Sequence, residues 1–190
     1  MVADTDPREV RFGSERRAMR SFASLLLLCL LALPSLAQDR ALSDSFPLSV
    51  GLPSGWESFQ GDSKTPGEVL FLQSPKSGEL DALVTFSAHK LPPDWSDIPR
   101  RENFLMTVHK YRVRENQALT LGGAKGHKWV YEAPVSNGDV KLHYRLYLAL
   151  PATVGPKRLL VMQGLGPVEQ AEPALQLFNE MARSLSWSRE

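Results

Sequence analysis

Histidine is the residue type here best suited to proton transfer, and His143 and Glu132 are spaced so that an imidazole and a carboxylate could meet. They lie on two runs of alternating polarity that flank Asn137-Gly138, and a tight turn there pairs them across two strands. Such a pair could act as general acid and base or supply two ligands to a metal ion. A catalytic zinc site uses three protein ligands, so an ordinary pair on the solvent face is the alternative.

Two other histidines have different surroundings. His89 ends a predicted strand beside the loop KLPPDWSDIP, where it could approach Asp94 or Asp97, although local loop structure is the simpler interpretation. His127 falls on the apolar face of its predicted strand, which favours a structural role. The sequence contains no Gly-x-Ser-x-Gly, His-Glu-x-x-His, P-loop or Gly-x-Gly-x-x-Gly motif. We therefore expect no catalytic residue, no metal site and no cofactor.

Four residues near this loop are candidates for binding a partner. Trp95 stands among prolines and aspartates, outside any apolar period, and tryptophan is enriched where partners anchor. Arg100 and Arg101 begin a predicted helix in which basic residues outnumber acidic ones, so one helix face could meet an acidic partner. With Asp94 they form the candidate binding site. The alternatives are that Trp95 folds back as a lid on the core and that the basic face is merely solvated.

Apolar patterning outlines the strands that would position these residues. The run from Leu80 to His89 alternates, which predicts Val84 and Phe86 on the core face and Thr85 on the other. The remaining strands are expected at Phe46–Val50, Glu68–Gln73, on both sides of Asn137-Gly138 and at Arg158–Gln163, with a further short strand possible near Ala118–Leu121.

The Asn137-Gly138 dipeptide predicts a hairpin with a two-residue type I′ turn. That turn pairs Val135 with Val140 and sets the register of both strands. One face of the hairpin is then apolar and the other mostly polar. Pro134 is the discordant residue, and it indicates an edge position or a bulge.

Two amphipathic helices complete the pattern. The first is predicted at about Pro99–Arg114, since proline is tolerated in a first turn. The second is predicted at about Val168–Leu185, after a connection at Gly164-Leu165-Gly166, with its apolar residues from Ala171 to Leu185 on one stripe. The fold class is therefore α+β, a mainly antiparallel twisted sheet of about six or seven strands covered by two helices. The core stripe expected for the first helix consists of Phe104, Leu105, Val108 and Tyr111.

The segment SLLLLCLLALPSLAQ predicts a cleaved signal peptide. Its apolar run, from Phe22 to Leu33, is about 12 residues long, whereas a helix that spans a bilayer needs roughly 20. Basic residues precede the run, and Ser35-Leu36-Ala37 has the small-x-small pattern that a signal peptidase cuts. We expect cleavage between Ala37 and Gln38.

Residues 1–37 are thus expected to be a signal peptide and residues 38–190 a single domain. The segment that begins at Met19 is by itself a compact signal peptide. We therefore expect translation to start at Met19, so that residues 1–18 are not part of the protein. A twin-arginine signal at Arg16-Arg17 is the alternative.

Composition limits the partners of the exported chain. Cys29 is the only cysteine, and the three leucines before it argue against a lipoprotein. The chain after cleavage would therefore have no disulfide and no thiolate metal site. Five of the 22 basic and four of the 21 acidic residues precede Gln38, which leaves 17 of each. A chain without net charge has no general attraction for nucleic acid, and we expect no membrane span after cleavage.

The sequence resembles the PsbP-like superfamily. The residues that carry this resemblance are PLSVGLPSGWE (Pro47–Glu57), LGGAKGHKWVYE (Leu121–Glu132), LHYRLYLAL (Leu142–Leu150) and the closing helix, and together they cover most of Phe46–Trp187. The resemblance implies the α+β fold described above and a binding or assembly role without a shared active site. It assigns a role to no single residue, and the signal peptide fits the bacterial envelope members.

Three hypotheses for function follow. The leading one is a non-catalytic binding or assembly module, periplasmic or extracellular, whose partner is a protein or an envelope component. The second is a small secreted hydrolase or metal-dependent enzyme that uses His89, His143 and nearby carboxylates. The third is a carrier of an apolar ligand between sheet and helices, because the strand at Leu142–Leu150 is rich in leucine.

Overall fold

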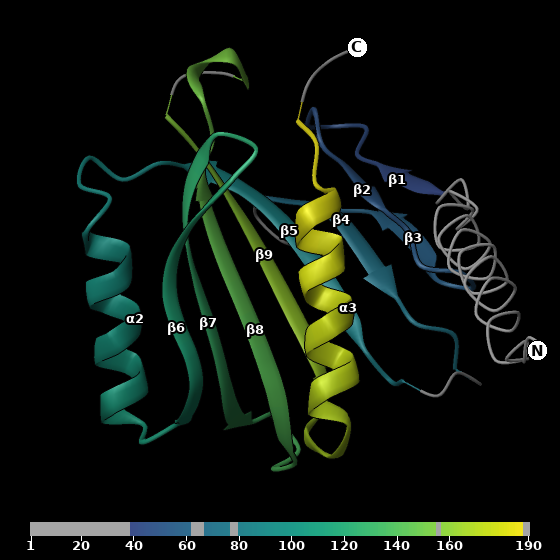
Figure 1. Cartoon of the computed structure of the whole chain (residues 1–190), viewed down its shortest axis with the longest axis vertical. Helices are drawn as coiled ribbons and strands as arrows, with labels where there is room; N and C mark the ends of the chain where they lie inside the picture. The colour runs from purple at the N-terminus through teal and green to yellow at the C-terminus, as the bar shows by residue number, and fades with distance from the viewer. Residues whose placement is uncertain (1–38, 62–66, 77–79, 155–156, 188–190) are drawn as a thin grey trace, which may run out of the picture. The chain divides into compact units, whose positions relative to one another are not determined.

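A computed structural model describes residues 39–61, 67–76, 80–154 and 157–187 (Figure 1). The signal peptide predicted at residues 1–37, its start at Met19 and its cleavage between Ala37 and Gln38 lie outside the described residues. The elements, in chain order, are β1 (Arg40–Leu42), β2 (Ser49–Gly51), β3 (Glu57–Gln60), β4 (Glu68–Gln73), β5 (Leu83–Lys90), α2 (Asp97–Val108), β6 (Arg112–Leu121), β7 (Ala124–Pro134), β8 (Val140–Ala149), η1 (Ala152–Val154), β9 (Arg158–Pro167), η2 (Val168–Gln170) and α3 (Ala171–Ser184).

The main sheet has seven strands within the described ranges, in the order β3-β4-β5-β9-β8-β7-β6, and every neighbouring pair is antiparallel. Strands β1 and β2 form a separate small sheet, which a bridge between Ser49 and Ser186 ties to the end of α3. The expected α+β class and mainly antiparallel sheet are therefore confirmed. No helix in the described part of the chain is long and apolar enough to cross a membrane.

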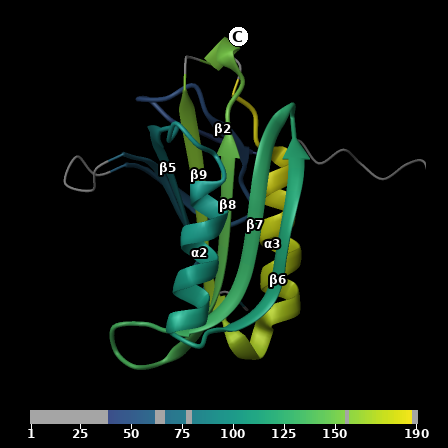
Figure 2. The ribbon, with the colours of Figure 1, turned by 90° about the vertical axis from the view of Figure 1, so that its left-hand side faces the viewer.

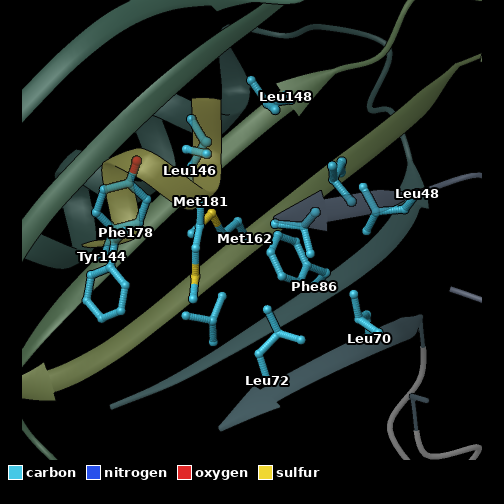
Figure 3. Packing of buried hydrophobic residues seen from close by; sticks show 14 of the residues in the cluster. Leu48, Leu70, Leu72, Phe86, Tyr144, Leu146, Leu148, Met162, Phe178 and Met181 are labelled. Atoms are coloured by element: carbon cyan, nitrogen blue, oxygen red, sulfur yellow. The ribbon is translucent and has the colours of Figure 1, made fainter. Parts of the chain in front are cut away.

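The two helices lie on opposite faces of the sheet (Figure 2). Helix α3 covers what we call the first face, where Phe178 and Met181 pack with Tyr144, Leu146 and Met162 in the larger core (Figure 3). Helix α2 covers part of the opposite, second face. There Ile98 and Met106 join a smaller cluster whose sheet residues are Trp129, Tyr131, Ala133, Tyr147, Leu159 and Val161.

Several sequence predictions hold because one side of each element faces the larger core. Strand β4 has the predicted bounds. In β5, Val84 and Phe86 are fully buried in the larger core, while Thr85 lies on the other side. In α3, the predicted stripe is buried from Ala171 to Ala182, and its last residue, Leu185, is half-buried.

The predicted hairpin register is wrong by one residue. Val140 pairs with Pro134, not with Val135. The connection is a three-residue loop, in which Gly138 N–H donates to Val135 C=O at 2.9 Å and Val135 N–H donates to Asp139 C=O at 2.8 Å. Gly138 has a φ of +90°, so it supplies the left-handed residue that follows a type I turn in such loops.

Local side-chain contacts and the burial of both hairpin faces explain this register. The Asn137 side chain accepts a hydrogen bond from Asp139 N–H and donates to the Asp139 carboxylate, which stabilises the longer loop. Since helices cover both faces of β7 and β8, a slip by one residue does not expose an apolar face to water.

Helix α2 turns a different side to the core than the sequence predicts. It buries Ile98, Glu102 and Met106, which recur every four residues. Phe104 and Val108, expected in the core, are 64% and 54% exposed. The buried carboxylate is the cause, because its partners on the sheet determine which side of the helix faces inward.

The first helix is also shorter than predicted, because Lys110 turns the chain with a φ of +54° and β6 begins at Arg112. Arg112 and Arg114 therefore lie on an edge strand. Gly164 and Gly166, expected in a connection, lie inside β9. A Cβ atom on Gly164 would lie 3.0 Å from the Phe178 ring, so this glycine allows α3 to approach the sheet closely.

Candidate functional site

A carboxylate buried between α2 and the second face organises the site. The Glu102 side chain is 1% exposed, and its Oε2 lies 3.1 Å from Nη1 of Arg145 on β8. Tyr147, one pleat further along β8, donates its hydroxyl to Glu102 Oε1 at 2.8 Å. Burial, followed by the nearby Glu102 charge, raises the pKa of Tyr147, so the phenol stays protonated and can donate. A charge in this position is stable only while both partners are present.

Asn103, the residue after Glu102, makes further polar contacts between α2 and the sheet. Asn103 Oδ1 accepts hydrogen bonds from Asn116 Nδ2 on β6 at 2.9 Å and from Trp129 Nε1 on β7 at 3.2 Å. Glu102 and Asn103 therefore attach the helix to three strands through polar contacts. This attachment fixes the rotation of α2 about its own axis.

A row of four stacked rings lies on the second face, next to the C-terminal end of α2. Ring centroids are 5.2 Å apart for His109 and Tyr111, 5.5 Å for Tyr111 and Tyr131, and 5.0 Å for Tyr131 and His143. His143 Nε2 is buried and has no hydrogen-bond partner among the described residues. His143 therefore serves as a packed ring of the second face.

The predicted pairing of His143 with Glu132 does not form. Because of the shifted register, Glu132 pairs with Leu142 and lies on the opposite face of the sheet from His143. Glu132 Oε1 accepts a hydrogen bond from Arg114 Nε at 2.7 Å instead. In the described ranges, no group of three or more His, Cys, Asp or Glu residues lies close enough together to hold a metal ion.

His127 also packs as an aromatic ring. Its centroid lies 4.0 Å from that of Trp129, and its Nε2 is 2.6 Å from Asn116 Oδ1. Burial lowers the pKa of His127, and burial followed by the nearby Arg145 charge lowers the pKa of His143. Both rings are therefore held neutral in the folded protein.

Acidification is expected to destabilise the fold through these two rings. In the unfolded chain each has a pKa near 6.5, above its value in the fold, so the unfolded state binds more protons. The free energy of unfolding should be highest above about pH 6.5 and fall as the pH drops below it. Urea titrations at pH 7.5 and 5.5 measure this, and a double His127→Phe, His143→Phe variant should show a smaller drop. An equal drop in that variant would assign the pH dependence to other groups.

A groove of about 470 Å³ opens beside α2, where the helix leaves the second face uncovered over β5 and β9. Tyr147 forms part of its wall, so the groove borders the buried Glu102 site. Its lining includes His89, Lys90, Asp97, Ile98, Arg101 and Val161.

The groove brings together some of the residues that the sequence singled out. His89 and Asp97 both line it, and the His89 ring interacts with Ser87 Oγ at 2.9 Å. Arg101, from the candidate binding site, lines it as well. These residues come from the end of β5 and from the N-terminal half of α2.

The other three candidate residues lie elsewhere. Trp95 is partly buried against the smaller cluster, which is the lid that was the alternative interpretation. Hydrogen bonds from the Ser96 side chain and then from Ser96 N–H, which lies 2.8 Å from Asp94 Oδ1, lower the pKa of Asp94. Arg100 lies 3.5 Å from Asp97 in an exposed ion pair.

Sequence reasoning missed Glu102, Arg145 and Tyr147. A signal for Glu102 was present, because Ile98 and Met106 stand four residues before and after it. A charged residue in the middle of an apolar row at helical spacing predicts a buried polar contact. Arg145 and Tyr147 lie on the face of β8 that alternation marks as mostly polar, and α2 covers that face.

Sequence comparisons assign no family to the chain, since no protein-family model and no curated protein matches it. Solved structures do match. Cyanobacterial PsbP (CyanoP) from Synechocystis sp. PCC 6803 is 14% identical, with a TM-score of 0.56 over 83% of this chain and 96% of that chain. LpqN of Mycobacterium tuberculosis, described as involved in cell envelope biogenesis, is 12% identical, with a TM-score of 0.54 over 80% of this chain and 86% of its own.

A Pseudomonas aeruginosa protein of unknown function, PA94, is 8% identical, with a TM-score of 0.52 over 80% of this chain and 99% of that chain. The chain therefore has a PsbP-like fold, as the sequence resemblance implies. Identities this low define the architecture alone.

Proposed function

We propose that this chain is an exported, non-catalytic module that binds a protein partner in the bacterial envelope through the outer face of α2. The observation that carries the proposal is the inverted polarity of this helix, which buries Glu102 and exposes Phe104 and Val108. The signal peptide predicted at residues 1–37 and the description of LpqN as involved in cell envelope biogenesis support the location.

The outer face has the composition of a protein-binding patch. Phe104 and Val108 are one helical turn apart, so their side chains lie next to each other. The nearby Arg100 and Arg101 side chains are 76% and 69% exposed. An apolar centre with a basic rim fits a partner that offers an apolar pocket surrounded by acidic residues.

The attachment of α2 supports the same role. Because Glu102 and Asn103 hold the helix to the sheet, Phe104 and Val108 are presented in a fixed orientation. A preorganised surface loses less conformational entropy on binding than a mobile one. The buried polar contacts thus serve to position the exposed apolar residues.

The replacement Val108→Asp is expected to reduce partner binding at least about tenfold, as for a central interface residue. A photocrosslinking amino acid at the exposed position Thr107 reports binding in intact cells of the native host. Leu42→Asp is the control, because Leu42 is also an exposed aliphatic residue, at 62%, but lies on β1, outside the sheet that α2 covers. It should leave the crosslinked band unchanged.

Equal crosslinking in both aspartate variants would reject the outer face as the binding surface. The intact mass of the uncrosslinked protein from the same cells tests export separately. A chain that begins at Gln38 is expected, and one that retains the leucine-rich segment would reject cleavage at that position.

A further inference from the structure

The groove beside α2 combines a buried apolar floor with exposed cations at its rim. Ile98, Leu159 and Val161 supply the floor and are each at most 6% exposed. Lys90 and Arg101 stand at the rim with exposed side chains. We propose that this groove is a binding site for a small amphiphilic anion, whose apolar chain lies on the floor and whose carboxylate or phosphate lies between these two cations.

The charge balance around the groove favours an anion. The single carboxylate of Glu102 lies 3.1 Å from Arg145 and 3.8 Å from Arg101, so two guanidinium groups share one negative charge. Lys90 has no ionic partner among the described residues. Asp97, the acidic residue of the lining, lies 3.5 Å from Arg100. The groove therefore carries excess positive charge, and a cleft with apolar walls concentrates the resulting field.

The size of the groove indicates a small molecule. Its volume of about 470 Å³ lies within the range of roughly 300–1,000 Å³ that is usual for ligand pockets. Such pockets have mostly apolar walls and a few polar groups that orient the ligand. Here the Tyr147 ring is part of the wall, and Lys90 and Arg101 are the polar groups at the rim. This site shares Arg101 with the rim of the outer face of α2 but uses neither Phe104 nor Val108, so it does not depend on the function proposed above.

Sodium decanoate is a suitable probe, and isothermal titration of the full-chain protein measures its affinity. A Lys90→Gln, Arg101→Gln double variant should bind decanoate about tenfold more weakly, a loss of about 1.4 kcal/mol for two charge contacts at a partly exposed site. The matched control is Lys125→Gln, Arg183→Gln, which removes the same charges from exposed positions outside the groove lining. Its affinity should equal that of the unchanged protein.

Gln163→Trp fills the groove from an exposed position and should abolish binding without disturbing the packed floor. Neutral decanol should bind at least about tenfold more weakly than decanoate, for the same electrostatic reason. Val108→Asp should keep full decanoate affinity, which separates this site from the proposed partner surface.

Three results would overturn the inference. One is the absence of decanoate binding below its micellar concentration. Another is an equal loss of affinity in the groove variant and its control. The third is cosedimentation with anionic phospholipid vesicles without binding of free decanoate, which would assign the cations to a membrane surface.

Discussion

Replacing Glu102 with alanine is expected to lower the free energy of unfolding by about 3 kcal/mol. The substitution leaves the Arg145 guanidinium and the Tyr147 hydroxyl without their shared acceptor. Breaking a buried ion pair costs about 3–5 kcal/mol, and the lower end applies because the Arg145 side chain is 29% exposed. Urea denaturation followed by circular dichroism measures the change.

Two further variants test whether the expected loss of stability comes from the buried contacts of Glu102. Glu172→Ala removes a carboxylate that is 88% exposed and should change stability by less than about 0.5 kcal/mol. A Glu102→Leu, Arg145→Leu double variant should recover much of the loss, because replacing both members of a buried pair by apolar residues is often close to neutral. If Glu102→Ala behaves like Glu172→Ala, the buried carboxylate does not hold α2 in place.

The contact between Phe178 and Gly164 should give the second large effect. Phe178→Ala is expected to cost about 3–5 kcal/mol, since its ring is fully buried between α3 and the sheet. Gly164→Val should cost about 1–3 kcal/mol, because its Cβ would meet three atoms of the Phe178 ring at 3.0–3.1 Å. The same denaturation assay measures both variants.

The double variant is the decisive measurement for this contact. With Phe178 shortened to alanine, the valine at position 164 has room, so the combined loss should be smaller than the sum of the two single losses. Leu165→Val, on the opposite face of β9, is the control and should cost less than about 1.5 kcal/mol. Strict additivity of the two losses would show that Gly164 has another role.

Prediction from sequence succeeded where one side of an element faces the core and the other faces water. Val84 and Phe86 in β5 and the Ala171–Ala182 stripe of α3 follow this rule, and their periodicity is sufficient to identify the buried side. Strand β4 was recognised from its continuous apolar run.

The same reasoning failed on the second face. There both sides of β7 and β8 are covered, so alternation does not select a register, and Asn137-Gly138 is compatible with loops of two or three residues. In α2, Phe104 and Val108 lie outside, while the side that faces the sheet carries Glu102 with its contacts to Arg145 and Tyr147. Long-range polar partners leave no periodic pattern in a sequence, which is why the groove and the partners of Glu102 on β8 could not be located in advance, although the spacing of Ile98 and Met106 marks Glu102 itself.

Strand β9 joins two parts of the sheet that are each built from local pairings. It lies between β5 and β8, and Leu83 pairs with Leu165, about 80 residues later in the chain. While the polypeptide is being synthesised, β3–β5 and β6–β8 can each associate, but neither has its central neighbour until the last strand is complete. Folding should therefore be a late, cooperative closure on the millisecond-to-second scale typical of chains dominated by distant pairings.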